Sequence, residues 1–300
     1  MKPKLLIILG PTASGKSDMA VKLAKRFNGE VISADSRQVY RGLNVGTGKI
    51  TRAEMKGVRH HLLDVIDPKR QFTAERFKKL ADKAIRDIQK RSKLPIICGG
   101  TGFYIDVITN RLELPAVGID LRLRKKLANK TAGQLLSILE RLDSERAQRL
   151  NDSDRKNPRR LIRAIEIARA QNEIGKSDLQ IREVGPPENL IFIGINPSKD
   201  ILKERIHVRL LKRLNQKDNM IQEARKLHTK GLSWKRMEEL GLEYRYLARY
   251  LQGKMTREEM IERLEIEIWH YAKRQLTWFK RNKEIRWFES ATVAANAIRL

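Results

Sequence analysis

The feature that most constrains this chain is the segment Gly10–Ser17, which has the spacing G-x-x-x-x-G-K-S. Five apolar residues precede it, at 5–9, and apolar residues at helical spacing follow it. We therefore expect a strand over residues 4–9, a glycine loop and then a helix over residues 17–27. Gly10 and Gly15 permit backbone geometries that turn successive N–H groups toward phosphate oxygens, and the new helix adds the positive end of its dipole. The pattern therefore predicts a site for a diphosphate or a triphosphate.

Two side chains of this loop suit the chemistry of a phosphate site. Lys16 can reach the terminal phosphate, and the Ser17 hydroxyl can hold Mg²⁺. A glycine-rich turn that matches the spacing by chance is the alternative, and the flanking strand and helix patterns argue against it. The diphosphate-binding residues that we expect are Gly10, Pro11, Thr12, Ala13, Ser14, Gly15, Lys16 and Ser17, with Ser17 as the metal ligand.

The chain of 300 residues carries 63 Lys and Arg against 36 Asp and Glu, a net charge of +27. A small phosphate ligand needs few cations, so a polyanionic partner such as nucleic acid accounts for the excess better than a solvated Lys-rich surface does. No apolar run approaches the ~20 residues of a membrane helix, and the stretch at 5–9 is too short for a signal peptide. The single cysteine, Cys98, can form no internal disulfide, so we expect a cytoplasmic protein without a membrane partner.

Two further polar segments follow predicted strands. Residues 30–34 are predicted as a strand that ends at Asp35, and residues 95–98 as a buried strand followed by the glycine turn of Thr101. Because ligands of open α/β sheets lie beyond the carboxyl ends of the strands, Asp35 and Thr101 should share the rim of the phosphate loop. A helix N-cap is the alternative role for Asp35. Residues 60–66 are predicted as another strand, whose adjacent histidines face opposite ways and make poor joint metal ligands.

The strand pattern disappears between residues 113 and 187, where helical patterns dense in Arg and Lys take over. It returns at 189–195, so the strands on either side should share one sheet and residues 113–187 should form an insertion. The linkers are expected at 114–118 and 184–187. The rest of the chain is predicted as helical, with Thr256 in a capping box that opens a long helix.

One helix of the insertion is predicted to begin at Asn157-Pro158, because an N-cap residue precedes a proline at the first helical position. Its apolar residues lie on one face. A stripe of cations without an anion favours a phosphate backbone as partner, and a solvated face is the alternative. The cations of the stripe are Lys156, Arg159, Arg160 and Arg163.

Together these segments resemble the bacterial tRNA dimethylallyltransferases, which prenylate an adenine beside the anticodon. The likeness covers nearly the whole chain, and the pairing of GPTASGK with DSRQVY at 35–40 is its most specific part. Two segments, 241–246 and 268–269, depart from the family's usual pattern. The other matching segments are Val45-Gly46-Thr47 before Lys49, His60-His61-Leu62-Leu63-Asp64, GGTGFY at 99–104, RRLIRAIE at 159–166 and YAKRQLTWF at 271–279.

The resemblance implies an α/β fold: a P-loop NTPase-like, kinase-like parallel sheet flanked by helices, with an inserted all-helical domain. Residues 1–112 and 188–300 would form the catalytic core with its C-terminal helices, and residues 113–187 the tRNA-binding insertion. The implied reaction moves a dimethylallyl group from dimethylallyl diphosphate to the N6 amine of adenosine 37, next to the anticodon of tRNA. The implied partners are a tRNA anticodon stem-loop and dimethylallyl diphosphate, the cofactor is Mg²⁺, and we expect a monomer.

The chemistry explains the residue types. The adenine amine is a weak nucleophile whose proton becomes acidic during attack, so Asp35 is the natural general base. Lys16, Mg²⁺ and, by the resemblance, Arg209 would stabilise the leaving diphosphate, and Thr101 would contact the nucleotide or the reacting groups. Ser36 and Gln38 would bind the extruded base. The residues expected to contact tRNA are Asp35, Ser36, Arg37, Gln38, Thr101, Arg122, Arg159, Arg160, Leu161, Ile162, Arg163, Tyr244 and Arg245.

Three other functions share parts of this pattern. A small-molecule or nucleoside kinase would have the phosphate loop, the acceptor aspartate and an Arg-rich lid, but little need for the charge of +27. A non-catalytic RNA-binding protein would not depend on Asp35. An enzyme that prenylates free adenine nucleotides would have little use for the basic insertion.

Overall fold

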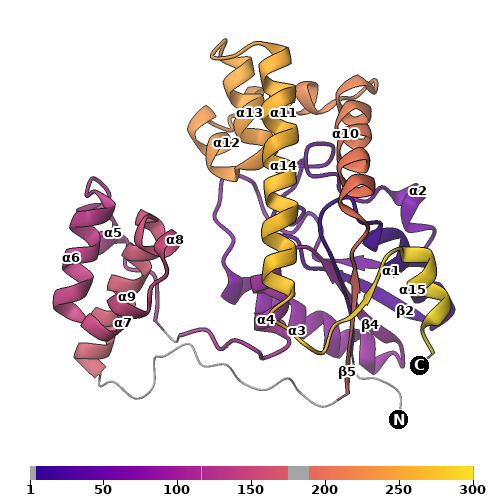
Figure 1. Cartoon of the computed structure of the whole chain (residues 1–300), viewed down its shortest axis with the longest axis horizontal. Coiled ribbons are helices and arrows are strands. Elements are labelled where there is room, and N and C mark those ends of the chain that lie inside the picture. Colours follow the sequence, from indigo (N-terminus) through magenta and orange to yellow (C-terminus); the bar gives the residue numbers. More distant parts are fainter. Residues whose placement is uncertain (1–4, 116, 175–188, 300) are drawn as a thin grey trace. The chain divides into compact units, whose positions relative to one another are not determined.

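Six parallel strands form one sheet with the spatial order β3-β2-β4-β1-β5-β6 (Figure 1). The computed structural model describes residues 5–115, 117–174 and 189–299. The central strand β1 pairs with β4 on one side and with β5 on the other, so strands before and after the insertion share the sheet as predicted. The strands are β1 (Leu5–Leu9), β2 (Gly29–Ser33), β3 (His60–His61), β4 (Leu94–Gly99), β5 (Leu190–Ile195) and β6 (Arg286–Phe288).

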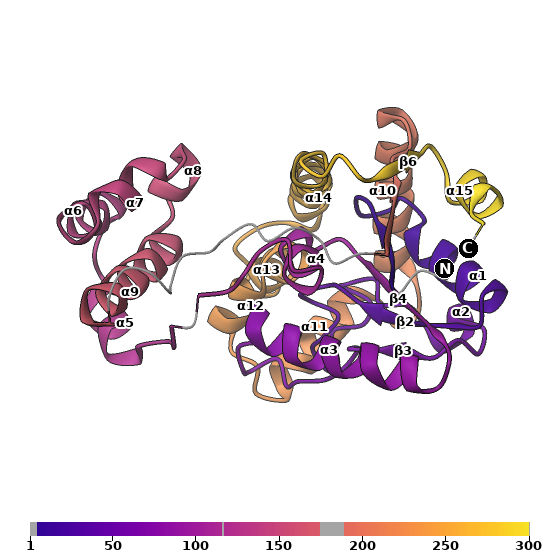
Figure 2. The ribbon, with the colours of Figure 1, turned by 90° about the horizontal axis from the view of Figure 1, so that it is seen from below.

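Both faces of the sheet are buried. Successive side chains of a strand point to opposite faces, so Ile7 and Leu9 pack with α3 (Ala74–Lys90) and α4 (Gly102–Ile108) in one core. Figure 2 shows α3 running along the sheet on this first face. The alternate residues of β1, Leu6 and Ile8, pack on the other face in a second core. The helices of that second face are α1 (Lys16–Arg26) and α15 (Ala291–Ala297). The buried apolar strands are typical of a parallel sheet covered by helices, which confirms the predicted fold class.

A bundle of helices follows β5 and has its own hydrophobic core. Its longest helix begins at the capping box of Thr256, as predicted, and the Thr73 side chain caps α3 by accepting from the backbone N–H of Arg76. In the described ranges, no helix combines the length and the apolar character that crossing a bilayer requires. The helices of the bundle are α10 (Lys199–Asn215), α11 (Met220–Thr229), α12 (Trp234–Leu240), α13 (Leu242–Leu251) and α14 (Arg257–Phe279), and a short α2 (Arg52–Met55) lies between β2 and β3.

Contacts divide the chain into two compact units, one of Met1–Thr109 with Pro186–Leu300 and the other of Asn110–Gly185. The first carries the sheet and the bundle, and we call it the core unit. The second, the insertion, contains only helices among its described residues, and Leu135, Leu139 and Leu161 lie at the centre of its hydrophobic core. Its helices are α5 (Leu121–Leu127), α6 (Ala132–Leu142), α7 (Ser144–Arg149), α8 (Asp152–Arg155) and α9 (Pro158–Ile174).

Helix α9 begins at Pro158, and the Asn157 side chain accepts from the backbone N–H groups of Arg159 at 3.1 Å and Arg160 at 3.4 Å, which confirms the predicted start. Several predicted features lie outside the described residues. They are the linker at 184–187, the boundary at 188, residue 4 of the first strand and residue 116 of the other linker.

Two strand predictions were wrong. The strand expected over residues 60–66 is only two residues long, because the backbone of Leu62 and Asp64 is left-handed, with φ of 63° and 55°, and leaves the extended path. The C-terminal region is not entirely helical, because β6 joins the edge of the sheet beside β5. A strand of three residues has too short a pattern to be recognised by alternation.

Candidate active site

The loop between β1 and α1 has the backbone geometry that its glycines permit. Gly10 and Gly15 have φ of 154° and 91°, and Ala13 is also left-handed with φ of 62°. A Cβ atom on Gly10 would lie 2.5 Å from the carbonyl oxygen of Ile195, so no larger residue fits there. The hydroxyl oxygen of Ser14 is buried and has no hydrogen-bond partner among the described residues. A buried polar atom without a partner is costly unless a ligand completes it.

Lys16 and Ser17 open helix α1 at the end of this loop. The Lys16 ammonium donates to the carbonyl oxygen of Pro11 at 3.0 Å. Burial lowers the pKa of Lys16, while the negative charge of Asp35 opposes that change. The Ser17 side chain is exposed and is hydrogen-bonded to the thiol of Cys98, whose pKa burial raises to about 12. The loop therefore holds a cation and a hydroxyl side by side.

Asp35 follows β2 and organises the turn after it. Its Oδ1 atom accepts from the backbone N–H groups of Arg37 at 2.8 Å and Gln38 at 3.2 Å. Its other oxygen, Oδ2, makes no hydrogen bond within the described part of the chain. Asp35 thus caps a turn through one oxygen and keeps the second oxygen for another partner, so the two roles weighed from the sequence are compatible.

The carboxylate of Asp35 lies among cations. Its charge opposes the lowering, chiefly by burial, of the pKa of Lys16, Lys49 and Arg209. Charges act on one another in this way when they share a poorly solvated part of the protein. The structure thus brings together the phosphate-loop lysine, the aspartate and Arg209, which are 193 positions apart at their extremes (16 to 209).

Thr101 connects the turn after β4 with the turn of Asp35. Its backbone N–H donates to the carbonyl of Ala34 at 3.1 Å, and its hydroxyl oxygen accepts from the N–H of Ser36 at 3.0 Å. Tyr271, on α14, lies near enough to the Thr101 side chain for its pKa to be affected by it. Burial raises the pKa of Tyr271, and the Asp35 charge raises it further. Thr101 therefore lies beside the carboxylate, between two strand ends.

Arg209 reaches the site from α10. It donates to the carbonyl of Gly48 at 2.9 Å, and Arg213, one turn later, donates to the carbonyl of Gly46 at 2.7 Å. The segment that they hold, residues 44–48, also contacts Glu223 of α11, which accepts from the N–H groups of Asn44, Val45 and Gly46 at 2.7–2.9 Å. Arg209 is therefore fixed against a loop that is itself tied to the bundle.

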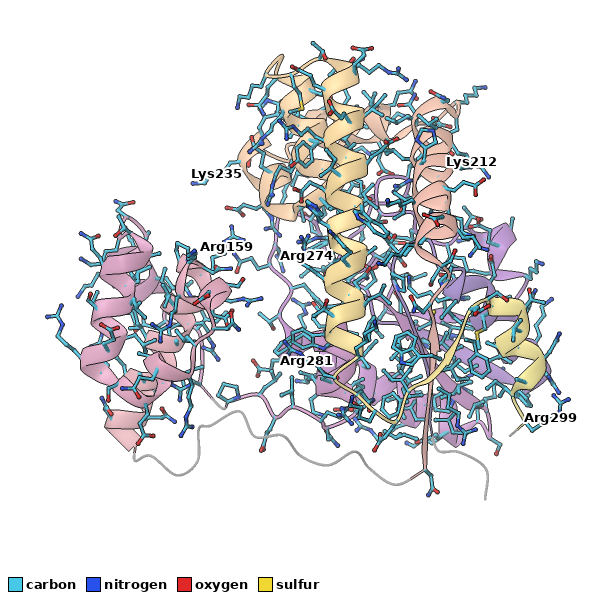
Figure 3. All side chains as sticks on the ribbon, in the orientation of Figure 1. Arg159, Lys212, Lys235, Arg274, Arg281 and Arg299 are labelled. Carbon is cyan, nitrogen blue, oxygen red and sulfur yellow. The ribbon has the colours of Figure 1, made fainter. Side chains whose placement is uncertain are left out.

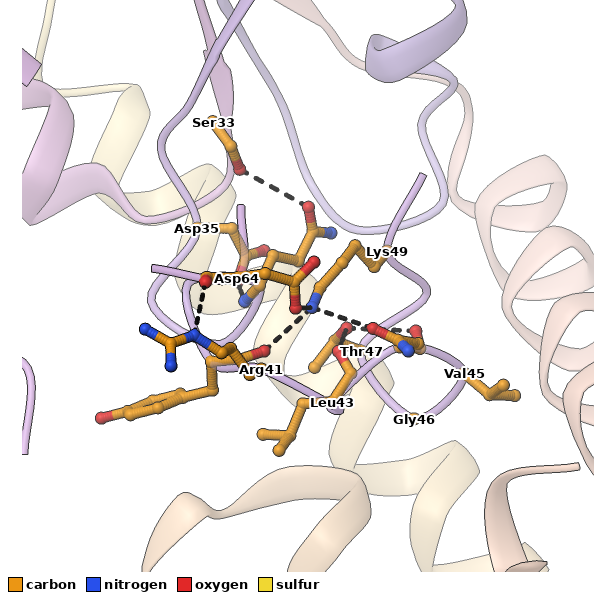
Figure 4. Close-up of polar contacts among 12 residues, drawn as sticks. Ser33, Asp35, Arg41, Leu43, Val45, Gly46, Thr47, Lys49 and Asp64 are labelled. Carbon is orange, nitrogen blue, oxygen red and sulfur yellow. Dashed lines mark hydrogen bonds and ion pairs between the residues drawn. The ribbon is translucent and has the colours of Figure 1, made fainter. Parts of the chain in front are cut away.

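Lys49, unlike Lys16, has a structural role. Its ammonium donates to the carbonyl of Tyr40 at 2.9 Å, to Asn44 Oδ1 at 3.0 Å and to Asp64 Oδ1 at 2.6 Å (Figure 4). Burial lowers the pKa of Lys49, and the hydrogen bond and charge of Asp64 oppose it. All three donor positions of the ammonium are occupied, so Lys49 holds the turn together.

The residues predicted to contact tRNA are divided between the two units. In the insertion, Arg122 and Arg159 are exposed, and Ile162 is partly buried. Arg160 pairs with Asp154, and Arg163 donates to Glu166 and to the carbonyls of Val117 and Gly118. Two of the four cations of the expected stripe therefore have an anion within the insertion, which corrects the expectation of a stripe without one. In the core unit, Arg245 is exposed, and Arg37 and Gln38 are partly buried beside Asp35.

Two of the residues predicted to contact tRNA have buried side chains. Leu161 is fully buried in the core of the insertion, and Tyr244 is 1% exposed in the core of the bundle. The Tyr244 hydroxyl donates to Glu223 Oε1 at 2.5 Å, so it supports the loop that Arg209 contacts.

Sequence reasoning missed Glu223 and Gln275. Gln275 of α14 is 6% exposed and contacts both glycine turns of the site. The signal available for Gln275 was its place in the segment YAKRQLTWF, a polar residue at an apolar helical position. Glu223 carried no comparable signal.

The residues around Ser17 suit a magnesium ion only in part. Among the described residues, no group of three or more His, Cys, Asp or Glu side chains could hold a metal. Mg²⁺ is commonly bound by one or two protein oxygens together with phosphate oxygens and water. The exposed hydroxyl of Ser17, next to a phosphate loop, fits that arrangement, so a metal there depends on the bound phosphate for its other ligands.

The fold and the site define a phosphate-loop α/β protein with an acceptor carboxylate on the rim of the loop and a helical insertion in the sheet. The IPP transferase family model matches residues 38–282. The chain belongs to the IPP transferase family.

Relatives and solved structures agree with that assignment. The tRNA dimethylallyltransferase 2 of Treponema denticola is 43% identical over 281 residues, which are 93% of this chain and 92% of the relative. The crystal structure of the full-length tRNA isopentenylpyrophosphate transferase of Bacillus halodurans is 36% identical, with a TM-score of 0.71, and the match covers 98% of this chain and 95% of that one. A eukaryotic dimethylallyltransferase is similar in fold, at 23% identity and a TM-score of 0.78, over 98% and 75% of the two chains. No kinase is among these relatives.

Proposed function

We propose that this protein transfers the dimethylallyl group of dimethylallyl diphosphate to the N6 amine of adenosine 37, next to the anticodon of a tRNA, and releases diphosphate. The relatives named above support the substrate pair. The observation that carries the proposal for this chain is the carboxylate of Asp35, which keeps one oxygen without a hydrogen bond among the described residues, next to Thr101 and within reach of the charge of Lys16.

The donor diphosphate would bind the loop of residues 10–17. The left-handed geometry of Gly10, Ala13 and Gly15 and the buried, unpartnered hydroxyl of Ser14 support this assignment. Ser17 would hold Mg²⁺, which when bound neutralises charge on the phosphate oxygens. Lys16 would leave its contact with the Pro11 carbonyl for a phosphate oxygen, a stronger acceptor because it is charged.

The reaction forms a bond between the amine nitrogen and the allylic carbon and breaks the bond from that carbon to the diphosphate oxygen. The amine proton passes to Asp35, an effect worth roughly 10²–10⁴ in rate. The departing diphosphate carries away the bonding electrons, and Lys16 and Arg209 stabilise the charge that develops on it. Arg209 is held by Gly48, so it needs little rearrangement when that charge appears.

The acceptor would be an unpaired adenosine, since extruding a base costs a few kcal/mol and least where pairing is absent. Ser36 and Gln38, on either side of Arg37 in the Asp35 turn, would bind the adenine edge. The exposed Arg122 and Arg159 of the insertion and Arg245 of the core unit would contact RNA phosphates. Exposed cations of the core unit, including Lys235, Arg274 and Arg281, also project into solvent (Figure 3). A cytoplasmic location and a monomeric state remain predictions from the sequence.

One experiment tests the proposal directly. The protein, Mg²⁺, dimethylallyl diphosphate and an anticodon stem-loop are incubated, and the RNA is weighed by mass spectrometry. We expect the mass of one dimethylallyl group to be added at adenosine 37, and the gain to disappear when the metal is chelated. An identical stem-loop with guanosine at that position is the control. Phosphoryl transfer from ATP to an acceptor without prenyl transfer would instead favour the kinase.

A further inference from the structure

Helix α14 passes beside both glycine turns of the site, and one buried side chain contacts them together. Gln275 Oε1 accepts from the backbone N–H of Thr12, in the phosphate loop, at 2.8 Å. Its Nε2 donates to the backbone carbonyl of Gly100, in the turn that leads to Thr101, at 2.8 Å. The side chain is 6% exposed, so water does not compete for either bond.

The chemistry of the two contacts requires an amide. One neighbour is a donor and the other an acceptor, and a glutamine side chain supplies both functions in one plane. A Cβ atom on Gly100 would collide with the Gln275 amide, so the glycine there permits the close approach. Removing the amide would leave the buried carbonyl of Gly100 without a partner, which costs about 1–3 kcal/mol, and would also take the acceptor from the partly buried N–H of Thr12.

Two neighbouring side chains of α14 lie on the side of Thr101, where the acceptor nucleoside is proposed to bind. Tyr271, one turn earlier, lies near enough to the Thr101 side chain for its pKa to be affected by it, and Trp278, one turn later, donates to Asp106 Oδ2 of α4 at 2.7 Å. Both of these residues lie beside the segment after β4. Gln275 contacts both that segment and the phosphate loop. A substitution of Gln275 therefore alters the spacing between the phosphate loop and the segment after β4.

We propose that Gln275 is a positioning residue that sets the distance between the phosphate loop and the Thr101 turn. The inference rests on the proposed function, since it assigns the donor diphosphate to the loop and the acceptor amine to the side of Asp35 and Thr101. Reacting atoms must approach to about 3–3.5 Å, and a misplacement of about 1 Å can cost 10²-fold in rate. Gln275 does not touch the reacting atoms; it holds the two turns that do.

The test compares three variants in the full-length protein. Gln275→Met keeps the shape of the side chain and removes both bonds. Gln275→Glu keeps the acceptor, and its carboxyl can donate to Gly100 only when it is protonated. Thr277→Val is the matched control, because the exposed Thr277 hydroxyl bonds only to the Lys273 carbonyl of its own helix, at 3.0 Å.

We expect Gln275→Met to lower kcat/KM for dimethylallyl diphosphate by about 100-fold and to leave the Kd for the stem-loop within threefold. Thr277→Val should match the wild type. Burial raises the pKa of a carboxyl group, so the activity of Gln275→Glu relative to the wild type should rise as the pH is lowered from 8 to 6, while that of Gln275→Met stays constant. A merely structural role would give no such difference between the two variants.

The inference is overturned if Gln275→Met keeps kcat and KM within twofold of the wild type, or if the relative activity of Gln275→Glu does not change with pH. Should Gln275→Met fail to fold, Gln275→Glu decides alone, because its comparison is made within one protein. Binding of inorganic pyrophosphate with Mg²⁺ separates the two proposals. If the wild type binds pyrophosphate tightly and Gln275→Met about 10-fold more weakly, but neither prenylates RNA, the positioning holds and the proposed function fails.

Discussion

The core unit and the insertion use their cations in different ways. Near the phosphate loop, Lys16 and Arg209 donate to the main-chain carbonyls of Pro11 and Gly48. In the insertion, Arg124 and Arg163 both donate to Glu166, which is 3% exposed, and Arg160 pairs with Asp154. A carbonyl orients a cation without neutralising it, whereas a carboxylate cancels its charge. Lys16 and Arg209 therefore keep their charge for an anion, whereas Arg124, Arg160 and Arg163 stabilise the helices of the insertion.

The difference shows that counting basic residues overstates the charge available for RNA. Arg163 lies in the predicted stripe, yet it is bonded to Glu166 and to two carbonyls. Arg122 is exposed and has no such partner among the described residues. A basic side chain contributes to RNA binding only if its own unit has not already neutralised it. The following predictions test this contrast, beginning with the largest effect.

Replacing the carboxylate of the site should remove chemistry without removing binding. Asp35→Asn keeps an oxygen that can accept from the N–H groups of Arg37 and Gln38, so the turn should persist. We expect single-turnover rates to fall about 10²–10⁴-fold, since the general base is lost, and the Kd for the stem-loop to stay within threefold. A rate near that of the wild type would refute the assignment of Asp35.

Neutralising the central carboxylate of the insertion should destabilise that unit. Burial raises the pKa of Glu166, but the hydrogen bonds from Arg124 and Arg163 outweigh it and leave the pKa below its usual value. Glu166→Gln would leave two arginines without a counter-charge, and we expect about 3 kcal/mol to be lost from the free energy of unfolding of the insertion. Hydrogen exchange of α5 and α9 measures the loss.

The matched control for this variant is Glu145→Gln. Glu145 pairs with Arg149 at 3.5 Å on an exposed helix of the same unit, with side chains 78% and 72% exposed. Such a pair contributes about 0–1 kcal/mol, so its removal should leave the exchange rates almost unchanged. Equal losses in the two variants would show that Glu166 is not a stabilising centre.

The core unit also has an ion-paired centre, at the starts of its strands and away from the site. Glu30, 1% exposed, accepts from Arg91, Lys93 and His61, and the hydrogen bond from Arg91 is the main cause that holds its pKa below the usual range. Because the folded pKa lies below the unfolded value of about 4, the ionised group stabilises the fold at neutral pH. That contribution is lost as the pH falls through the unfolded value toward the folded one.

The measurement compares urea unfolding of the wild type and Glu30→Gln at several pH values. We expect the variant to be less stable at pH 7 and the difference to shrink between pH 5 and pH 3. A difference that is constant over this range would contradict the ionised state of Glu30. Enzyme activity at pH 7 should depend little on the variant while it stays folded, because Glu30 lies at the opposite end of β2 from Asp35.

The smallest effect concerns the salt dependence of RNA binding. Binding should weaken steeply with salt, and Arg122→Ala should reduce the slope of log K against log salt by about 1, because one phosphate contact is lost. Its melting temperature should equal that of the wild type. Arg163→Ala should instead lower the melting temperature, because it removes a partner of Glu166. If Arg122→Ala and Arg163→Ala change the salt slope of RNA binding equally and neither lowers the melting temperature, the proposed contrast between free and neutralised cations is wrong.

The parts of the molecule that the sequence predicted are those with local causes. The phosphate loop depends on glycines within eight residues, the helix starts at Pro158 and Thr256 depend on the adjacent residues, and the buried strands depend on apolar runs. The strands β3 and β6 were misjudged because two or three residues carry no periodicity. The sequence also could not indicate that Arg160 and Arg163 have anionic partners, since spacing on one helix does not include neighbouring elements.

By itself, the sequence determined that the chain has a phosphate loop, a sheet with a helical insertion and an aspartate at a strand end, because these follow from backbone preferences over short distances. The tertiary structure alone decided what surrounds them. Gln275 meets Thr12 across 263 positions, and Glu223 meets the loop of residues 44–46 across more than 170. Hydrogen bonds between such distant positions form only when the fold brings the groups together and excludes water, and no local pattern records that outcome.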